Sequence, residues 1–298
     1  MSDNISRRDF IHSTLVAGCL LLLPAPLKAE AKGSPSSKSK GVLVDITKCV
    51  GCGLCQAACE QWNNLPMEQV DRSQDTPSLS AWTWTLPELT EIEKDGEVNR
   101  VFAKRQCMHC LHPACVSACP VGALRKTESG PVVYDASRCI GCRYCMVACP
   151  FGIPKLEWEK SLPRIRKCTF CADRQQAGLE PACTAACPTG ALTFGNREDL
   201  IAEAEARLQE HPERYVSHLY GKDELGGTSW MYLSPVSFEE LDFPDLETES
   251  VTQLSETVAT YGTAGIVVGV TAVLGGLYRF SKRTQDTENT RQEGESEA

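Results

Sequence analysis

Sixteen of the 17 cysteines fall into four short groups, which we call quartets, between residues 49 and 187. They are Cys49, Cys52, Cys55 and Cys59; Cys107, Cys110, Cys115 and Cys119; Cys139, Cys142, Cys145 and Cys149; and Cys168, Cys171, Cys183 and Cys187. A 4Fe–4S cluster needs one thiolate on each iron, and cysteines spaced by two residues in a tight loop can reach three irons. The pattern therefore predicts sixteen ligands for four 4Fe–4S clusters, and hence electron transfer.

The first and third quartets have the spacing C-x2-C-x2-C-x3-C of bacterial ferredoxins, in which the fourth cysteine serves the neighbouring cluster. Zinc sites also use C-x2-C pairs, but four ligands in so short a run do not suit the usual two-pair tetrahedral site. Disulfides between cysteines this crowded would be strained. Two or three clusters remain an alternative if one quartet were incomplete, although all sixteen positions are cysteine.

The quartets belong to an internal repeat. Residues 113–124 and 181–192 are identical at 9 of 12 positions, and residues 42–49 parallel residues 132–139. The second pair of segments predicts a short β-branched strand that leads into each ferredoxin-type cysteine loop. Proline follows the last cysteine of three quartets, whereas Glu60 follows the first.

A few polar residues accompany the quartets. His109 lies inside the second quartet and could hydrogen-bond a cluster sulfur, although a surface or packing role is the simpler interpretation. Arg164, Arg166 and Lys167 precede the fourth quartet. They could offset cluster charge or meet an acidic partner, but a solvated basic face is the default.

The rest of the composition restricts the function. A net charge of −9 argues against broad nucleic-acid binding, which needs a basic face. Neither a nucleotide-binding glycine motif nor a hydrolase or metalloprotease motif occurs in the sequence, so we expect no catalytic site. Residues 196–210 have the pattern of a capped amphipathic helix that packs beside the cluster region.

The N-terminus has the features of a cleaved export signal. Arg7 and Arg8 precede Phe10 and Ile11, an apolar stretch follows, and small residues come after it. The arginine pair resembles a twin-arginine signal, a route that carries folded proteins and therefore suits clusters assembled in the cytoplasm. An ordinary secretory signal with a chance arginine pair is the alternative.

Cys19 lies outside the quartets. It follows Val16, Ala17 and Gly18, which resemble a lipoprotein cleavage box. The apolar run continues beyond it to Leu23, whereas such a box should end the run. We therefore favour an unmodified cysteine within the signal, with lipidation as the alternative.

The C-terminal region predicts a membrane anchor. Residues 258–278 contain no charged side chain, and as a helix rising about 1.5 Å per residue they match the hydrocarbon layer. Arg279, Lys282 and Arg283 follow, which favours a cytoplasmic tail and an exported globular part. Gly265 and Gly269 give a small-xxx-small spacing that permits close packing of another membrane helix. A glycine-rich helix buried in a soluble core is the alternative.

Several stretches resemble the four-cluster iron–sulfur subunits of the dimethyl-sulfoxide-reductase superfamily and of membrane uptake hydrogenases. They are residues 105–110, 139–154, 218–221 and 226–228. With the twin-arginine start and the single anchor, the chain is most similar to the electron-transfer subunit of hydrogenase-2-type enzymes. Residues 59–66 look more like formate dehydrogenase β subunits. The resemblance covers roughly residues 40–280.

In that family each cluster is bound by three cysteines of one quartet and the last cysteine of another. The first quartet is paired in this way with the fourth, and the second quartet with the third. The resemblance thus implies four ligand sets, numbered here as sets 1 to 4. Set 1 is Cys49, Cys52, Cys55 and Cys187, and set 2 is Cys59, Cys168, Cys171 and Cys183. Set 3 is Cys107, Cys110, Cys115 and Cys149, and set 4 is Cys119, Cys139, Cys142 and Cys145.

Together these observations predict an α+β fold with two ferredoxin-like dicluster units and one C-terminal transmembrane helix. The expected divisions are a signal at 1–31, a four-cluster domain at 40–195, an extension at 196–256, a transmembrane helix at 258–278 and a disordered cytoplasmic tail at 279–298.

The resemblance implies an electron-transfer subunit at the periplasmic face of the cytoplasmic membrane, without a catalytic site of its own. Its expected partners are a catalytic hydrogenase or formate dehydrogenase subunit and an integral membrane quinone-reacting or cytochrome b subunit. A self-contained iron–sulfur reductase and a structural metal-binding module are the alternatives. The first would need a substrate, flavin or nicotinamide motif, and redox titration would separate all three.

Overall fold

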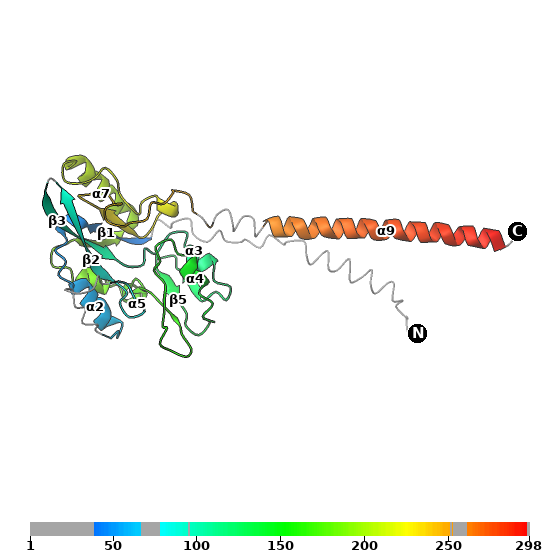
Figure 1. Cartoon of the computed structure of the whole chain (residues 1–298), viewed down its shortest axis with the longest axis horizontal. Coiled ribbons are helices and arrows are strands. Elements are labelled where there is room, and N and C mark those ends of the chain that lie inside the picture. The colour runs from blue at the N-terminus through cyan, green and yellow to red at the C-terminus, as the bar shows by residue number, and fades with distance from the viewer. Residues whose placement is uncertain (1–38, 67–77, 95, 251, 253–260, 297–298) are drawn as a thin grey trace. The chain divides into compact units, whose positions relative to one another are not determined.

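The computed structural model describes residues 39–66, 78–94, 96–250, 252 and 261–296 (Figure 1). The predicted signal at 1–31, including Arg7, Arg8 and Cys19, lies outside these residues. The description below therefore begins with the segment that leads to the first quartet.

A three-stranded sheet forms the centre of the apolar core. Strand β1 (Lys40–Asp45) lies between β8 (Leu192–Asn196), with which it pairs antiparallel, and β9 (Trp230–Leu233), with which it pairs parallel. Val42, Leu43 and Val44 are at most 1% exposed, so both faces of β1 are covered. The β-branched strand predicted before the first quartet is confirmed.

Helix α7 (Arg197–Glu210) covers one face of this sheet. Its N-cap is Asn196, whose side chain accepts a hydrogen bond from the Glu198 amide, 3.0 Å away. The buried face of the helix packs on β1 and β9 through an apolar cluster that comprises Leu43, Leu200, Ile201, Ala204, Met231 and Leu233. The predicted capped amphipathic helix is confirmed.

The cysteine loops lie among short elements (Figure 1). The antiparallel pairs are β2 (Leu86–Lys94) with β3 (Glu97–Arg105), β4 (Leu124–Lys126) with β5 (Val132–Tyr134), and β6 (Lys155–Leu156) with β7 (Ile165–Arg166). The short helices are α2 (Leu54–Trp62), α3 (Ala114–Ser117), α4 (Tyr144–Val147), α5 (Ala172–Gln176) and α6 (Ala182–Ala185). Two 3-10 turns, η1 (Ile46–Lys48) and η2 (Glu224–Gly226), complete this part. Apart from β2, β3 and α2, these elements have at most five residues and depend on their neighbours for stability.

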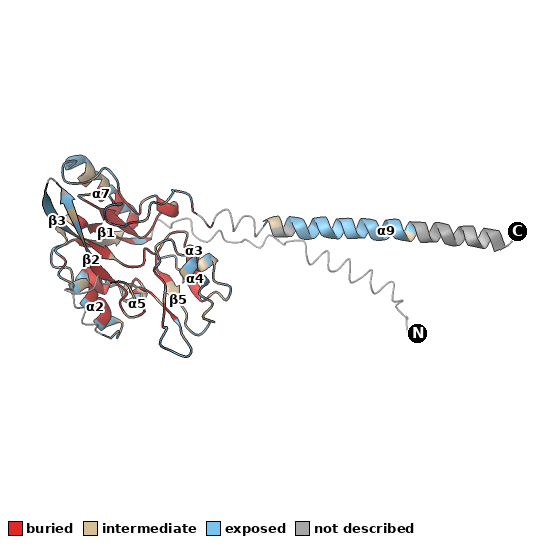
Figure 2. Ribbon diagram, viewed as in Figure 1, coloured by how far each residue is buried: buried red, intermediate tan, exposed pale blue. Residues whose placement is uncertain are grey.

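The segment predicted as an extension, 196–256, takes part in the core. Strand β9 from this segment forms one edge of the central sheet, and its four residues are at most 1% exposed. In Figure 2 the buried residues, coloured red, gather in the part of the chain around β1, whereas α9 is mostly pale blue. The pairing with β1 joins residues almost 190 positions apart, such as Val42 and Trp230. No local sequence pattern encodes such a contact. The division at 195 stays a prediction, and β9 pairs with β1 across it.

Helix α9 (Thr263–Ser296) covers most of the predicted anchor at 258–278. Residues 258–260 lie outside the described part of the chain. Among the helices of the described residues, none meets the length and hydropathy needed to cross a membrane. The transmembrane helix therefore stays a prediction. The helix also runs through 279–296, where the sequence predicted a disordered tail.

Candidate iron–sulfur sites

Three of the four predicted ligand sets each line a separate cavity. The four cysteines of set 1 line one cavity, those of set 2 a second, and those of set 4 a third. Each cavity thus combines three cysteines of one quartet with the last cysteine of another. Four thiols around one space are the donor set that a 4Fe–4S cluster requires, so the residues fit the group.

The four cysteines of set 3 also lie close enough together to interact electrostatically. Burial raises the pKa of Cys110 well above its ordinary value, and the thiols of Cys107, Cys149 and Cys115 raise it further. These are the other three members of the set. Within the described residues, no group of three or more His, Cys, Asp or Glu side chains is arranged to hold a single metal ion.

The first C-x-x-C loop of each quartet shares a backbone feature. The residue before the second cysteine has a left-handed conformation in each, with φ of 65° at Gly51, 48° at His109, 69° at Gly141 and 57° at Phe170. Such turns direct successive backbone N–H groups to one side, where they can bind a negatively charged group. The Phe170 amide, for example, donates to the Cys168 sulfur at 3.3 Å. The loops are thus shaped to hold thiolates.

The two ferredoxin-type loops are entered by the same turn. Asp45 accepts hydrogen bonds from the backbone N–H and the hydroxyl of Thr47 (3.1 and 2.6 Å) just before Cys49. Asp135 does the same for Ser137 (3.0 and 2.6 Å) just before Cys139. This common turn is the structural counterpart of the parallel between residues 42–49 and 132–139.

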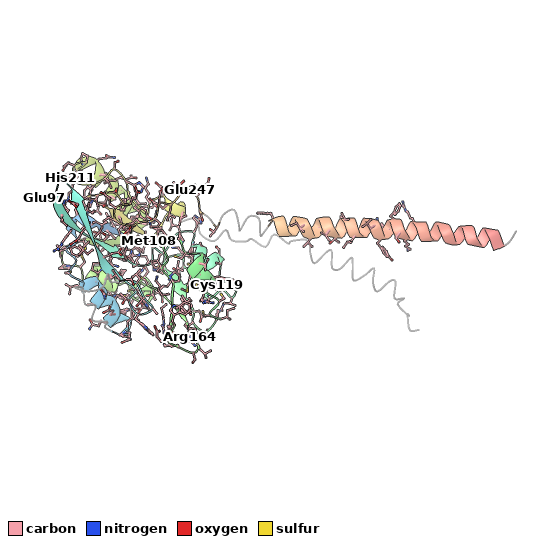
Figure 3. The ribbon with its side chains drawn as sticks, in the orientation of Figure 1. Glu97, Met108, Cys119, Arg164, His211 and Glu247 are labelled. Atoms are coloured by element: carbon pink, nitrogen blue, oxygen red, sulfur yellow. The ribbon has the colours of Figure 1, made fainter. Side chains whose placement is uncertain are left out.

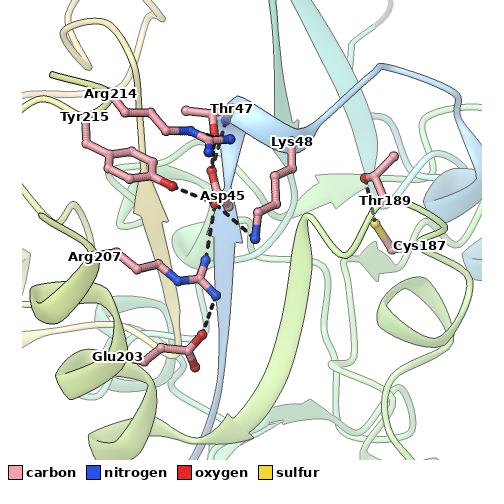
Figure 4. Close-up of polar contacts among 9 residues, drawn as sticks. All are labelled: Asp45, Thr47, Lys48, Cys187, Thr189, Glu203, Arg207, Arg214 and Tyr215. Atoms are coloured by element: carbon pink, nitrogen blue, oxygen red, sulfur yellow. Dashed lines mark hydrogen bonds and ion pairs between the residues drawn. The ribbon is translucent and has the colours of Figure 1, made fainter. Parts of the chain in front are cut away.

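Asp45 is also tied to the elements around it (Figure 4). Its carboxylate accepts a hydrogen bond from the Tyr215 hydroxyl at 3.0 Å and forms ion pairs with Arg207 at 3.2 Å and Lys48 at 3.5 Å. Arg207 belongs to α7, so the helix and the segment after it fix the start of the set 1 loop. The matching Asp135 has one ion pair in the described structure, with Arg138 at 3.3 Å.

The four sets follow one another in a single file. Three thiol pairs interact electrostatically across neighbouring sets: Cys55 with Cys183, Cys168 with Cys107, and Cys115 with Cys145. These pairs link set 1 to set 2, set 2 to set 3, and set 3 to set 4. Figure 3 labels Met108, in the set 3 loop, and Cys119, in set 4. In this order, which we call the thiol file, sets 1 and 4 are the two ends.

The thiols are buried in an environment that disfavours free thiolates. Burial raises the pKa of Cys168 to about 12, that of Cys115 to about 12 and that of Cys55 to about 11. Bound iron would stabilise the thiolate forms, since metal ligands must be deprotonated. Ligand status itself remains a prediction for all sixteen cysteines.

Three lysines lie close to the thiols, and only Lys167 was singled out from the sequence, as a residue that could offset cluster charge. Lys104 and Lys167 are 2% and 5% exposed, and Lys126 is half-buried. Burial alone would lower the pKa of Lys104, but Cys183, Cys55 and Cys168 raise it above its ordinary value. Lys167 was interpreted as part of a solvated basic face. That interpretation is wrong for Lys167, because its ammonium group is buried and donates to the backbone carbonyl oxygens of Val132 and Cys168.

His109 is a packing residue with one ring nitrogen that has no hydrogen-bond partner in the described structure. It is fully buried and stacks on Phe170, with ring centroids 5.0 Å apart. Its Nδ1 accepts a hydrogen bond from the Val132 amide at 2.9 Å, which places the ring proton on Nε2. That nitrogen has no hydrogen-bond partner among the described residues. The packing interpretation from the sequence thus agrees with the structure.

Comparison with known proteins gives the same cofactor. Two family models described as 4Fe-4S dicluster domains match residues 48–123 and 98–197. The Hydrogenase-2 operon protein HybA of Escherichia coli O157:H7 is 37% identical over 330 aligned positions, covering 97% of this chain and 98% of that protein. The Formate dehydrogenase-O iron-sulfur subunit of Escherichia coli K12 is 39% identical over 233 positions, covering 76% and 74%. A Nitratidesulfovibrio vulgaris protein is 42% identical over 268 positions, covering 87% and 71%.

Proposed function

Because this chain belongs to the family of 4Fe–4S electron-transfer proteins that includes HybA and the formate dehydrogenase iron–sulfur subunits, we propose that it connects a catalytic hydrogenase to the membrane quinone pool. It is an electron-transfer subunit and not the catalytic one. The similarity to HybA covers almost the full length of both chains, which favours hydrogenase over formate dehydrogenase as the partner.

The single observation that carries this proposal is the file of four thiol sets. Each bound cluster would accept and release one electron at a time. Thiols of neighbouring sets interact electrostatically, which supports electron transfer between adjacent positions. Left-handed loop residues and backbone N–H donors hold the sulfurs in place.

The two ends of the file differ in their surroundings. At one end Cys52 of set 1 is exposed, beside the exposed side chains of Val50 and Leu54. At the other end, Ile140, Tyr144 and Val147, in and beside the set 4 loop, are exposed by 66%, 61% and 87%. We propose that the two partner proteins cover these two ends, one at each.

We propose further that the chain is exported by the twin-arginine route and held at the periplasmic face by a C-terminal helix. Arg7 and Arg8 support the export, and the uncharged stretch 258–278 supports the anchor. Ile266, Val268 and Leu274 on α9 are exposed by 60–68% on the isolated chain, as expected of side chains that face lipid or a membrane partner.

The proposed function is tested with the chain purified together with its catalytic partner. Hydrogen should reduce all four clusters, and a quinone analogue should reoxidise them only when the membrane partner is also present. The chain alone should show no turnover with hydrogen or with formate. Reduction by formate and not by hydrogen would assign the other partner, and turnover by the chain alone would contradict the proposal.

Replacing both Arg7 and Arg8 by lysine should strand the cluster-loaded precursor in the cytoplasm, because the twin-arginine route requires the pair. Fractionation followed by immunoblotting measures this. Replacing Arg279 and Arg283 by lysine makes the same chemical change outside the signal and should leave export normal. Mature protein outside the cytoplasm in the Arg7/Arg8 variant would indicate the ordinary secretory route.

A further inference from the structure

Two buried lysine ammonium groups lie where neighbouring ligand sets meet, one between sets 1 and 2 and the other between sets 2 and 3. Lys104 borders both the set 1 cavity and the set 2 cavity. Lys167 lies between sets 2 and 3, because its Nζ is 2.9 Å from the carbonyl oxygen of Cys168 and 4.0 Å from the Cys107 sulfur. Each lysine therefore touches two consecutive positions of the path.

The surroundings of Lys104 are neutral. Its Nζ donates to the Thr85 hydroxyl at 2.5 Å and to the Gln106 side-chain oxygen at 3.0 Å, and it lies 4.5 Å from the centre of the Trp230 ring. Gln106 is held in turn by Tyr232. Within the described residues, Lys104 forms no ion pair with a carboxylate. These dipoles orient the ammonium group but do not cancel its charge.

Lys167 is likewise held by neutral groups, in this case two backbone carbonyl oxygens. Its Nζ donates to the carbonyl oxygen of Val132 at 2.6 Å and to that of Cys168 at 2.9 Å. In the described part of the chain it, too, has no carboxylate partner. A buried charge without an opposite charge is strongly unfavourable, so a negative group must lie close by in the assembled protein.

We propose that Lys104 and Lys167 are positioning residues of the electron path, each of which supplies a fixed positive charge between two consecutive 4Fe–4S clusters and so favours their reduced states. This inference rests on the proposed ligand sets. Four thiolates give a bound cluster a net negative charge, and reduction adds one more. A nearby ammonium therefore stabilises the reduced form more than the oxidised form.

The electron balance is simple. One electron passes from one position of the file to the next, so that the donor position is oxidised and the acceptor position is reduced. No bond forms or breaks in this step. Because each lysine faces two positions, it raises the reduction potentials of both.

The test is a set of potentiometric titrations of the full-length, cluster-loaded protein, with electron paramagnetic resonance as the detection method. In Lys104→Gln, two of the four midpoint potentials should fall and two should stay. Each affected potential should fall by ~59 mV. At a fixed applied potential, this lowers the ratio of reduced to oxidised cluster about tenfold. In Lys167→Gln, two potentials should fall as well, and only one of these should be shared with Lys104→Gln, because set 2 borders both lysines.

Two further variants separate charge from packing. Lys104→Arg keeps the charge and should restore the wild-type potentials. Lys48→Gln removes the same charge next to Cys49, but Lys48 is partly exposed and paired with Asp45 at 3.5 Å, so the potentials should barely move. Iron analysis accompanies every variant.

Each outcome decides the inference. Unchanged potentials in a fully loaded Lys104→Gln, or an equal shift of all four clusters, would overturn it. Loss of iron in Lys104→Gln with full loading in Lys104→Arg would support it, since the charge is then required. Loss of iron in both variants would mean that Lys104 is needed for packing and not for its charge, which would overturn the inference. A wild-type protein without four clusters would refute the proposed function instead.

Discussion

Removing iron from the purified protein should unfold the region between residues 107 and 166 while the central sheet stays folded. The core of that region includes the thiols of Cys115 and Cys145 beside Leu124, Val132 and other apolar side chains. Its strands are only two or three residues long. Two-stranded elements of this length are not stable in water on their own. The clusters should therefore supply most of the stability there.

Hydrogen exchange with mass spectrometry measures this effect. After chelation of iron under oxidising conditions, amide protection should be lost across 107–166. It should persist in β1 and α7, because Leu43, Leu200 and Met231 pack without any cysteine. The iron-loaded protein passed through the same buffers without chelator is the control. Equal protection of 107–166 with and without iron would show that the fold does not depend on the clusters.

Replacing Cys119 by alanine should remove the set 4 cluster, although Cys119 belongs to the second quartet in the sequence. Cys119 lines the same cavity as Cys139, Cys142 and Cys145. Burial alone would raise its pKa, but backbone N–H groups that include those of Leu124 and Ala123 lower it below the ordinary value, which favours the thiolate. The Ala123 amide is 3.2 Å from the sulfur. We expect about four irons to be lost, together with electron transfer through that end.

Matched variants test the exchange of ligands between quartets. Cys119→Ala should lose the same spectroscopic signal as Cys142→Ala, whereas Cys149→Ala should lose the same signal as Cys110→Ala. Iron analysis and electron paramagnetic resonance of the four reduced variants decide this. Loss of one common signal in Cys119→Ala and Cys110→Ala would mean that each quartet binds its own cluster.

Much of the site could be predicted because its signals are local. Cysteine spacing in a loop reflects which irons that loop can reach. The turns at Asp45 and Asp135 lie within short segments of similar sequence. Helix α7 was predictable for the same reason, since its cap and its apolar face lie within fifteen residues. The arrangement of the four sets came from the family resemblance and not from spacing alone.

The remainder depends on contacts between distant segments. Strand β9 has four consecutive apolar residues, a pattern too short to identify its place beside β1. Lys104 follows Phe102 and Ala103 in a strand that would ordinarily turn a lysine to solvent. It is buried because Trp230, from the other end of the chain, covers it and because thiols surround it. Charge patterns in a sequence do not reveal such a burial.

The measurement that tests the central claim most directly is an iron and sulfide analysis of the anaerobically purified wild-type chain, combined with a redox titration. Four complete thiol sets predict about sixteen irons, about sixteen sulfides and four one-electron steps. A reproducible value near eight irons, or zinc in stoichiometric amount, would contradict the account of this chain as a four-cluster electron path.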